Sequence, residues 1–232
     1  PAAFEEILQA KNYPLSRFPA NPKFSLSLMQ QLAVNLAIQD SNEKIRSVNG
    51  PPGTGKTTLL KDVFAELIIE QAYEIAKLAD KDLSKMDRLN YYDKAYIAVM
   101  PSVIAEKEII VASSNNGAVQ NIVKELPLIN KIDESFVDKL RDADYFWEIS
   151  NAKLSMEWIK KEVGNSIEVP KAIPYEDEKH WGLFSLEGGK KENMSGIITA
   201  LKHVENYLYN AYESSSDVYA RFLEKYRKQC KY

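Results

Sequence analysis

Apolar residues recur every three or four positions over two stretches of the N-terminal half, which predicts two amphipathic helices. The first covers residues 25–39, where Leu28, Leu32 and Leu36 share a face and Ser25 or Ser27 is placed to cap the N-terminus. The second runs from residue 59 toward residue 79. Its apolar positions are Leu59, Leu60, Val63, Phe64, Leu67, Ile68, Ala72, Ile75 and Ala76.

Two short β-prone runs each precede a turn and a helical pattern. Residues 45–49 lead into the helix that begins near residue 59, and residues 108–113 lead through a turn into a helix over 118–126. The second run is apolar without alternation, which is typical of a strand buried on both faces of a parallel sheet. Two successive strand-loop-helix units predict an α/β fold with a parallel sheet and flanking helices.

The remaining chain is less regular. We expect a short helix over 4–10, an extended arm to residue 23, irregular structure over 80–93, and helices over 131–163 and 197–232, the last broken near 214–216. The expected buried face of 131–163 is Phe136, Leu140, Phe146, Trp147, Leu154, Trp158 and Ile159. Residues 181–186 are a candidate further strand. The predicted domains are an arm (1–24), the first part of a nucleotide-binding domain (25–130) and a mostly helical insertion (131–232).

The composition of the chain excludes few classes of protein. The chain has 232 residues, 45% of them hydrophobic and 27% charged, as in ordinary globular proteins. With a formal net charge of −3, nucleic-acid binding requires a local surface and does not follow from overall charge. A lone cysteine, Cys230, excludes an internal disulfide and fits a reducing, cytoplasmic setting. No run is apolar enough to span a membrane, and no leader pattern is present.

The strongest chemical signal is the nine-residue string Gly-Pro-Pro-Gly-Thr-Gly-Lys-Thr-Thr at 50–58, which fills the phosphate-binding loop pattern G-x-x-x-x-G-K-[S/T]. Glycines let the backbone curl so that its amides point at an anion. Lys56 is placed to contact the β- and γ-phosphates, and the Thr57 hydroxyl to ligate Mg²⁺. The string predicts ATP·Mg²⁺ at Gly50, Pro51, Pro52, Gly53, Thr54, Gly55, Lys56, Thr57 and Thr58, with Lys56 and Thr57 serving catalysis.

Two further segments indicate which class of NTPase this is. Residues 26–34, Leu-Ser-Leu-Met-Gln-Gln-Leu-Ala-Val, resemble the Q-motif of superfamily 1B helicases. Gln30 is in register with the adenine-reading glutamine, Gln31 is the alternative, and Ser27 stands where Asn is usual. Residues 113–122 resemble helicase motif Ia, with Gln120 where an acid is usual. The chain therefore resembles superfamily 1B DNA/RNA helicases, similar to the nonsense-mediated-decay RNA helicase, over roughly residues 26–127.

This resemblance implies a RecA-like ATP-binding domain of the AAA_11 type. It implies that Gln30 reads adenine and that the turn at Ser114, Asn115 and Asn116 contacts single-stranded DNA or RNA. A segment at 181–193 also resembles a tryptophan- and glycine-containing stretch of large bacterial members. AAA+ ATPases share the loop string, but an AAA+ strand at this distance ends in Asp-Glu, whereas residues 113–116 are Ser-Ser-Asn-Asn.

Hydrolysis in this family needs an Asp-Glu pair at a strand end and arginines from a second RecA-like domain. Asp133-Glu134 precedes a helix, where acids are expected, and Asp177-Glu178 follows no apolar strand. Neither is a convincing catalytic pair, so we expect an N-terminal part of a longer helicase, inactive by itself. Two alternatives stay open: a P-loop ATPase acting on proteins, and a partner-docking module in which the tyrosine-rich C-terminal region binds a protein.

Overall fold

A computed structural model describes residues 2–39, 45, 47–51, 53–82, 87–93, 95–113, 116–160, 166–183, 185–213 and 215–230. The chain forms two compact units. The first contains residues 1–18, 26–110 and 215–232, and the second contains residues 19–25 and 111–214. Within the described residues, no helix has an apolar stretch long enough to cross a bilayer.

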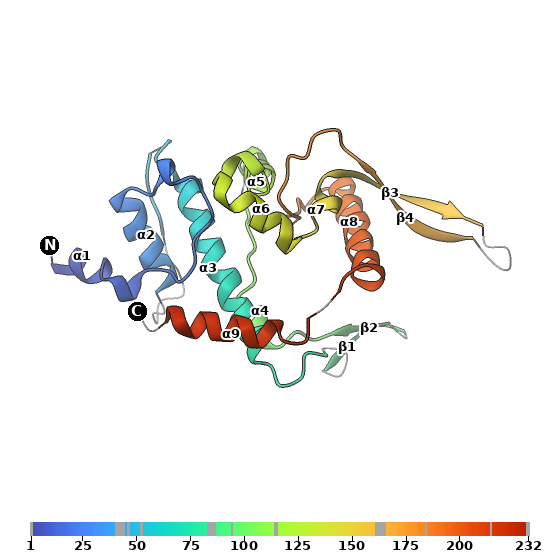
Figure 1. Cartoon of the computed structure of the whole chain (residues 1–232), viewed down its shortest axis with the longest axis horizontal. Coiled ribbons are helices and arrows are strands. Elements are labelled where there is room, and N and C mark those ends of the chain that lie inside the picture. Colours follow the sequence, from blue (N-terminus) through green and yellow to red (C-terminus); the bar gives the residue numbers. More distant parts are fainter. Residues whose placement is uncertain are drawn as a thin grey trace. The chain divides into compact units, whose positions relative to one another are not determined.

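The first unit is built on two packed helices, α2 (Leu28–Ile38) and α3 (Lys56–Lys77). Around them lie the remaining elements: α1 (Ala2–Ile7), the 3-10 helix η1 (Ala10–Asn12), β1 (Arg88–Tyr92), β2 (Ala95–Ala98), α4 (Ser102–Ala105) and α9 (Val218–Gln229) (Figure 1). Leu32 and Val34 of α2 and Leu59 of α3 are buried in the core between these helices. The predicted amphipathic helices are therefore confirmed, with Ser27 as the N-cap of α2.

Two buried acids on α3 hold the N-terminal arm. Asp62 accepts hydrogen bonds from Arg17 Nε and Nη2 at 3.1 and 2.8 Å and from the Phe18 amide at 2.9 Å. One turn later, Glu66 accepts from the amide and hydroxyl of Ser16 at 2.8 and 3.1 Å. A buried carboxylate must be paired, and here the arm supplies the donors.

The tyrosine-rich C-terminal helix packs on the other end of α3. Tyr226 of α9 stacks on Tyr73 with ring centroids 4.2 Å apart and an interplanar angle of 16°. Burial raises the pKa of Tyr226 to about 12. Tyr226 therefore contributes to the packing of α9 on α3.

The second unit combines short helices with an antiparallel hairpin. Its elements are η2 (Pro22–Phe24), α5 (Asn116–Glu125), η4 (Ile129–Lys131), α6 (Glu134–Ala143), α7 (Trp147–Ser150), β3 (Ala152–Ile159), β4 (Ile167–Pro174) and α8 (Lys191–Asn210). Strands β3 and β4 pair from Ala152↔Pro174 to Ile159↔Ile167. Helix α8 packs against both strands, and the far end of the hairpin extends beyond it (Figure 1).

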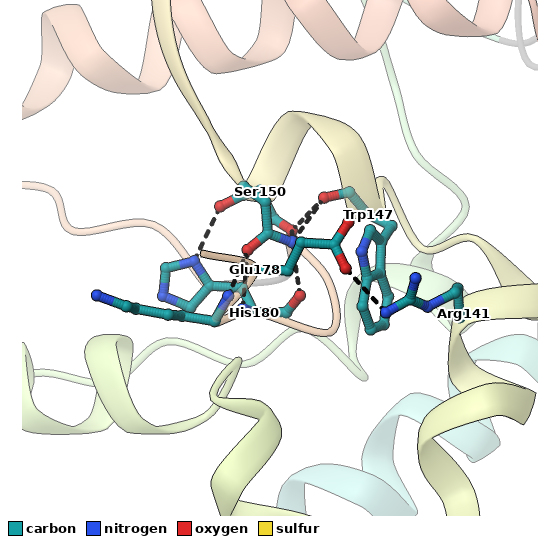
Figure 2. Close-up of polar contacts among 7 residues, drawn as sticks. Arg141, Trp147, Ser150, Glu178 and His180 are labelled. Atoms are coloured by element: carbon teal, nitrogen blue, oxygen red, sulfur yellow. Dashed lines mark hydrogen bonds and ion pairs between the residues drawn. The ribbon is translucent and has the colours of Figure 1, made fainter. Parts of the chain in front are cut away.

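A buried asparagine joins the segments of this unit. Asn151 Nδ2 donates to the carbonyls of Trp147 and His180 at 3.0 and 2.7 Å, and its Oδ1 accepts from the amides of Lys179 and His180 at 2.8 and 2.9 Å. His180 Nδ1 lies 2.8 Å from the Ser150 carbonyl oxygen (Figure 2). The side chain of Asn151 thereby fixes residues 179–180 against the end of α7.

Tyr207 of α8 contacts the turn between α6 and α7. In this turn, Asp144 and Phe146 have left-handed backbone conformations with φ of 43° and 58°. The Tyr207 hydroxyl donates to the Asp144 carboxylate, and this hydrogen bond is the main cause that raises the pKa of Tyr207 to about 12. Because the folded state favours the protonated phenol, the contact stabilises the fold below about pH 10, the tyrosine's ordinary pKa, and is lost as pH rises through about 12.

We therefore expect Tyr207→Phe to lower stability at pH 9, and the gap from the wild type to close toward pH 12. Urea unfolding followed by circular dichroism at pH 9, 10, 11 and 12 measures that gap. The wild type and the Tyr207→Phe variant share every other tyrosine, so the titration of those tyrosines cancels in the difference between the two stabilities. A gap that stays constant over this pH range would contradict the assignment.

Several expectations from sequence differ from the structure. Residues 45, 47–49 and 108–113 carry no strand pairing, so the part of the chain that the structure describes contains two antiparallel hairpins and no parallel sheet. Ile45 and Ile110 are 86% and 87% exposed, in agreement with the absence of a paired strand beside them among the described residues.

The helix expected over 131–163 ends at α7, and residues 152–159 form strand β3. Residues 152–158 alternate apolar and polar, a period of two that fits a strand and not a helix. Trp147 is buried as expected, whereas Trp158 is 68% exposed near the end of the hairpin. The irregular structure expected over 80–93 also includes β1.

The candidate strand at 181–186 is not a strand in its described residues. It is instead anchored to α5 and to the turn after α6. The Trp181 indole donates to the Leu126 carbonyl at 3.0 Å, and the Leu183 amide donates to the Tyr145 carbonyl at 3.0 Å. The indole and amide donors of this segment are therefore hydrogen-bonded to individual backbone carbonyls and not to a neighbouring strand.

Candidate nucleotide-binding site

The loop at 50–58 closes on itself through backbone turns that glycine permits. Gly53 and Gly55 have φ of +81° and +74°, a region that side chains disfavour. The Thr54 amide and hydroxyl both donate to the Pro51 carbonyl, at 3.4 and 2.8 Å. Gly55 is the N-cap of α3, and its carbonyl accepts from the amides of Thr58 and Leu59. The chain thus passes from a tight loop directly into a helix.

The side chain of Lys56 turns back into the loop. Its ammonium donates to the carbonyls of Gly50 and Pro51 at 2.6 and 2.9 Å. It therefore lies beside the N-terminus of the 22-residue helix α3, where the helix dipole is positive. An ammonium, a helix N-terminus and a glycine loop in one place have the chemistry that would suit an anion such as a phosphate.

Gln30 of α2 contacts both its own helix terminus and the loop. Its Oε1 accepts from the Ser27 amide at 2.8 Å, while the Ser27 hydroxyl accepts from the Gln30 amide at 3.4 Å, which completes a capping box. Its Nε2 donates to the carbonyls of Thr54 at 2.9 Å and Gly55 at 3.5 Å. The predicted adenine-reading residue and the phosphate loop therefore lie in direct contact.

A pocket of about 1010 Å³ opens beside the loop. Residues of α2 and of the segment leading into the loop line it, and Lys56 and Gln30 are among the lining residues. Most of the remaining walls are apolar: Met29, Leu32, Ala33, Leu36, Ala37, Val48 and Leu59. An apolar pocket next to an anion site suits a ligand with a flat ring system and a phosphate tail.

Comparison with protein families identifies the class. A model described as an AAA domain, AAA_11, matches residues 25–141, and it represents a domain of superfamily 1 helicase-like proteins. The chain belongs to this AAA-domain family. No curated protein and no solved structure matches the chain.

The other predicted site residues of this AAA-domain protein are placed only in part. Gly53, Thr54, Thr57 and Thr58 are exposed at the loop and on the first turn of α3. Pro52, Ser114 and Asn115 lie outside the described residues. Asn116 is the first residue of α5, but its side chain is also outside the described part. The structure therefore brings together Gln30, Lys56 and the described loop residues.

In each of the two Asp-Glu sequences, one acid makes a local contact in the second unit. Asp133 caps α6 by accepting from the Ser135 amide at 3.0 Å, and the Ser135 hydroxyl and amide lower the pKa of Asp133. Glu178 pairs with Arg141 at 2.8 Å, and that guanidinium lies 4.6 Å from the Trp147 ring (Figure 2). In the described residues, no group of three or more His, Cys, Asp and Glu is gathered for a metal ion.

Sequence reasoning missed the bond between Gln30 and the loop, although part of its signal is visible. The pattern Ser27-x-x-Gln30 is a capping-box signature, which places the glutamine at the first turn of α2. The contact with Thr54 and Gly55 joins residues 24 and 25 positions apart, so only the packing of α2 on α3 reveals it.

Gly55 should be the least replaceable glycine of the loop. A Cβ on Gly55 would lie 2.2 Å from Gln30 Nε2, whereas a Cβ on Gly53 would meet nothing within 4 Å. Both glycines have positive φ, so alanine costs about 1–2 kcal/mol of strain at either position. We expect Gly55→Ala to reduce ATP affinity at least about tenfold more than Gly53→Ala, measured by titration calorimetry. Equal losses would show that only the φ angle matters.

Proposed function

We propose that this chain is the ATP-binding part of a superfamily 1B helicase-like ATPase, which couples ATP hydrolysis to movement on single-stranded nucleic acid. The observation that carries the proposal is the phosphate loop of a helicase-like family with Lys56 turned into it at the start of α3. The family match supports a P-loop ATPase domain. Substrate and movement are our proposal.

In this proposal, residues 50–58 surround the triphosphate of ATP. Lys56 leaves the carbonyls of Gly50 and Pro51 to contact the β- and γ-phosphates, whose charge it neutralises. The Thr57 hydroxyl, exposed on the first turn of α3, would be a ligand of Mg²⁺. When bound, the ion would supply charge neutralisation between the β- and γ-phosphates.

The base would lie near Gln30, in the apolar pocket beside the loop. A glutamine amide has a donor and an acceptor side by side, which matches the edge of adenine. Its contact with the loop supports this placement, because base and phosphates of one nucleotide must be bound by neighbouring groups.

Nucleic acid would contact the turn at Ser114, Asn115 and Asn116, before α5. Short hydroxyl and amide side chains at a helix start suit phosphate or ribose groups. We also propose that residues 45–49 and 108–113 become strands of a parallel RecA-like sheet in a longer protein. The high exposure of Ile45 and Ile110 supports this, since apolar runs gain most from burial in such a sheet.

The longer, cytoplasmic protein would then supply the catalytic acid pair and the second motor domain. Titration calorimetry with ATP and Mg²⁺ tests the first part: the 232-residue chain should bind ATP and turn over almost none. No ATP binding would overturn the proposal. Robust turnover that Lys56→Ala abolishes would show that the catalytic acids lie within this chain.

Fluorescence anisotropy tests the second part, with labelled single-stranded DNA and RNA and a protein that includes the downstream domain. Binding should be strongest at low salt, because phosphate contacts release counterions. ATP binding without affinity for either strand would favour a P-loop ATPase that acts on proteins.

A further inference from the structure

The amide of Gln30 holds the backbone of the phosphate loop without any nucleotide. Its Nε2 donates to Thr54 O at 2.9 Å and to Gly55 O at 3.5 Å, while its Oε1 is fixed by the Ser27 amide at 2.8 Å. The side chain is thus anchored at its acceptor end by the helix cap and presents its donor end to the loop. Its direction is set before a ligand arrives.

Holding the Thr54 carbonyl also sets the direction of the next loop amide. A trans peptide group is planar, so its N–H points opposite to its C=O, and the described peptide bonds include no cis bond. With the Thr54 carbonyl turned toward Gln30, the N–H group of Gly55 points away from it. The Gly55 carbonyl is also held by helix α3, because it accepts from the amides of Thr58 and Leu59 at 2.9 and 3.2 Å. Amides at this position in a phosphate loop are the groups that receive an anion.

Close packing restricts how the Gln30 side chain can lie against the loop. A Cβ on Gly55 would lie 2.2 Å from Gln30 Nε2, so the glutamine rests directly on the loop backbone. Gly55 is also the N-cap of α3 with a left-handed φ of 74°. Glycine adopts this conformation without strain, and the contact with Gln30 adds a further restraint on the loop backbone.

We propose that Gln30 is a positioning residue for the phosphate loop, which orients the loop amides for phosphate whatever base the ligand carries. The proposal rests on the proposed nucleotide site and adds a role that base recognition does not require. Replacing a residue that only reads adenine would lower the affinity for ATP and leave the affinity for a ligand without a base unchanged. Replacing a residue that positions the loop would also lower the affinity for inorganic tripolyphosphate.

The experiment is titration calorimetry of the 232-residue chain with tripolyphosphate and with ATP, both in Mg²⁺. Gln30→Met keeps the length of the side chain and removes both bonds to the loop, together with the bond from the Ser27 amide. We expect it to weaken tripolyphosphate binding about tenfold, the equivalent of one net hydrogen bond. ATP binding should weaken by at least the same factor.

Two control variants separate loop positioning from other effects. Ser27→Ala removes the hydroxyl half of the capping box and keeps the bonds from Gln30 to the loop. Gln71→Met makes the identical substitution on α3, where Gln71 Nε2 donates to the Ile104 carbonyl at 3.3 Å. Both variants should retain wild-type affinity for tripolyphosphate, and melting curves should show all three variants folded.

The outcomes are distinct. Loss of ATP affinity in Gln30→Met with unchanged tripolyphosphate affinity would overturn the proposal and leave an adenine reader. An equal loss of tripolyphosphate affinity in Ser27→Ala or Gln71→Met would also overturn it, because general loosening would then explain the effect. A wild-type chain that binds neither ligand would overturn the proposed function and this inference together.

Discussion

Replacing Lys56 with alanine is expected to reduce the affinity of the chain for ATP by about a hundredfold or more. The ammonium lies inside the loop, 2.6 Å from Gly50 O and 2.9 Å from Pro51 O, where it can reach a bound phosphate with a small side-chain movement. Charge-assisted hydrogen bonds to phosphate contribute about 1.5–3 kcal/mol each. The variant loses every such bond from this side chain, and titration calorimetry measures the loss.

Lys77→Ala is the matched control, because Lys77 lies on the last turn of the same helix and pairs with Glu74 at 2.7 Å. It removes the same charge far along α3 from the loop, and an exposed ion pair of this kind contributes little to stability. ATP affinity should stay within about twofold of the wild type. A similar loss in both variants would mean that ATP responds to net charge and not to the position of Lys56.

Replacing Asn151 with alanine is expected to destabilise the second unit by about 3 kcal/mol or more. The side chain makes hydrogen bonds to four backbone groups, from Trp147, Lys179 and His180, and it is 5% exposed. Backbone groups left buried without partners cost about 1–3 kcal/mol each. The segment 179–180 would lose its bonds to the Asn151 side chain and keep the contact between His180 Nδ1 and the Ser150 carbonyl, and the unit would unfold at a lower urea concentration.

Tryptophan fluorescence reports this transition, because Trp147, Trp158 and Trp181 all belong to the second unit. Asn206→Ala is the control: Asn206 is exposed, and its carboxamide oxygen accepts a single bond, from Asn210 at 2.9 Å. Exposed changes of this type stay within about 0.5 kcal/mol of the wild type. A urea midpoint for Asn151→Ala equal to that of the control would show that the Asn151 contacts do not stabilise the unit.

Predictions from the sequence were most accurate where a pattern of residues fits only one type of structure. The apolar spacing of Leu28, Leu32 and Leu36 suits a helix and little else, and α2 follows it. The break near residues 214–216 separates α8 from α9 as expected. Asp133 is the N-cap of α6, because a carboxylate before a helix satisfies the free amides of its first turn.

The prediction of a helix over residues 152–159 was wrong because the wrong period was assigned, and the predicted parallel sheet is unconfirmed because its strands need partners. Residues 152–158 alternate with a period of two, which fits the strand β3 and not the helix expected over 131–163. The runs at 45–49 and 108–113 have the composition of buried strands, but a strand requires a neighbour to pair its backbone. No neighbouring strand lies beside either run among the described residues.

The sequence by itself determined the phosphate loop, its place before a helix, and membership of a helicase-like class, because these depend on residues adjacent along the chain. Tertiary structure alone decided that Gln30 holds Thr54 and Gly55, that Asp62 and Glu66 hold the arm, and that Asn151 joins distant loops. These contacts join residues 24 to 50 positions apart. Hydrogen bonds of this kind act over about 3 Å, so only packing brings such residues within range.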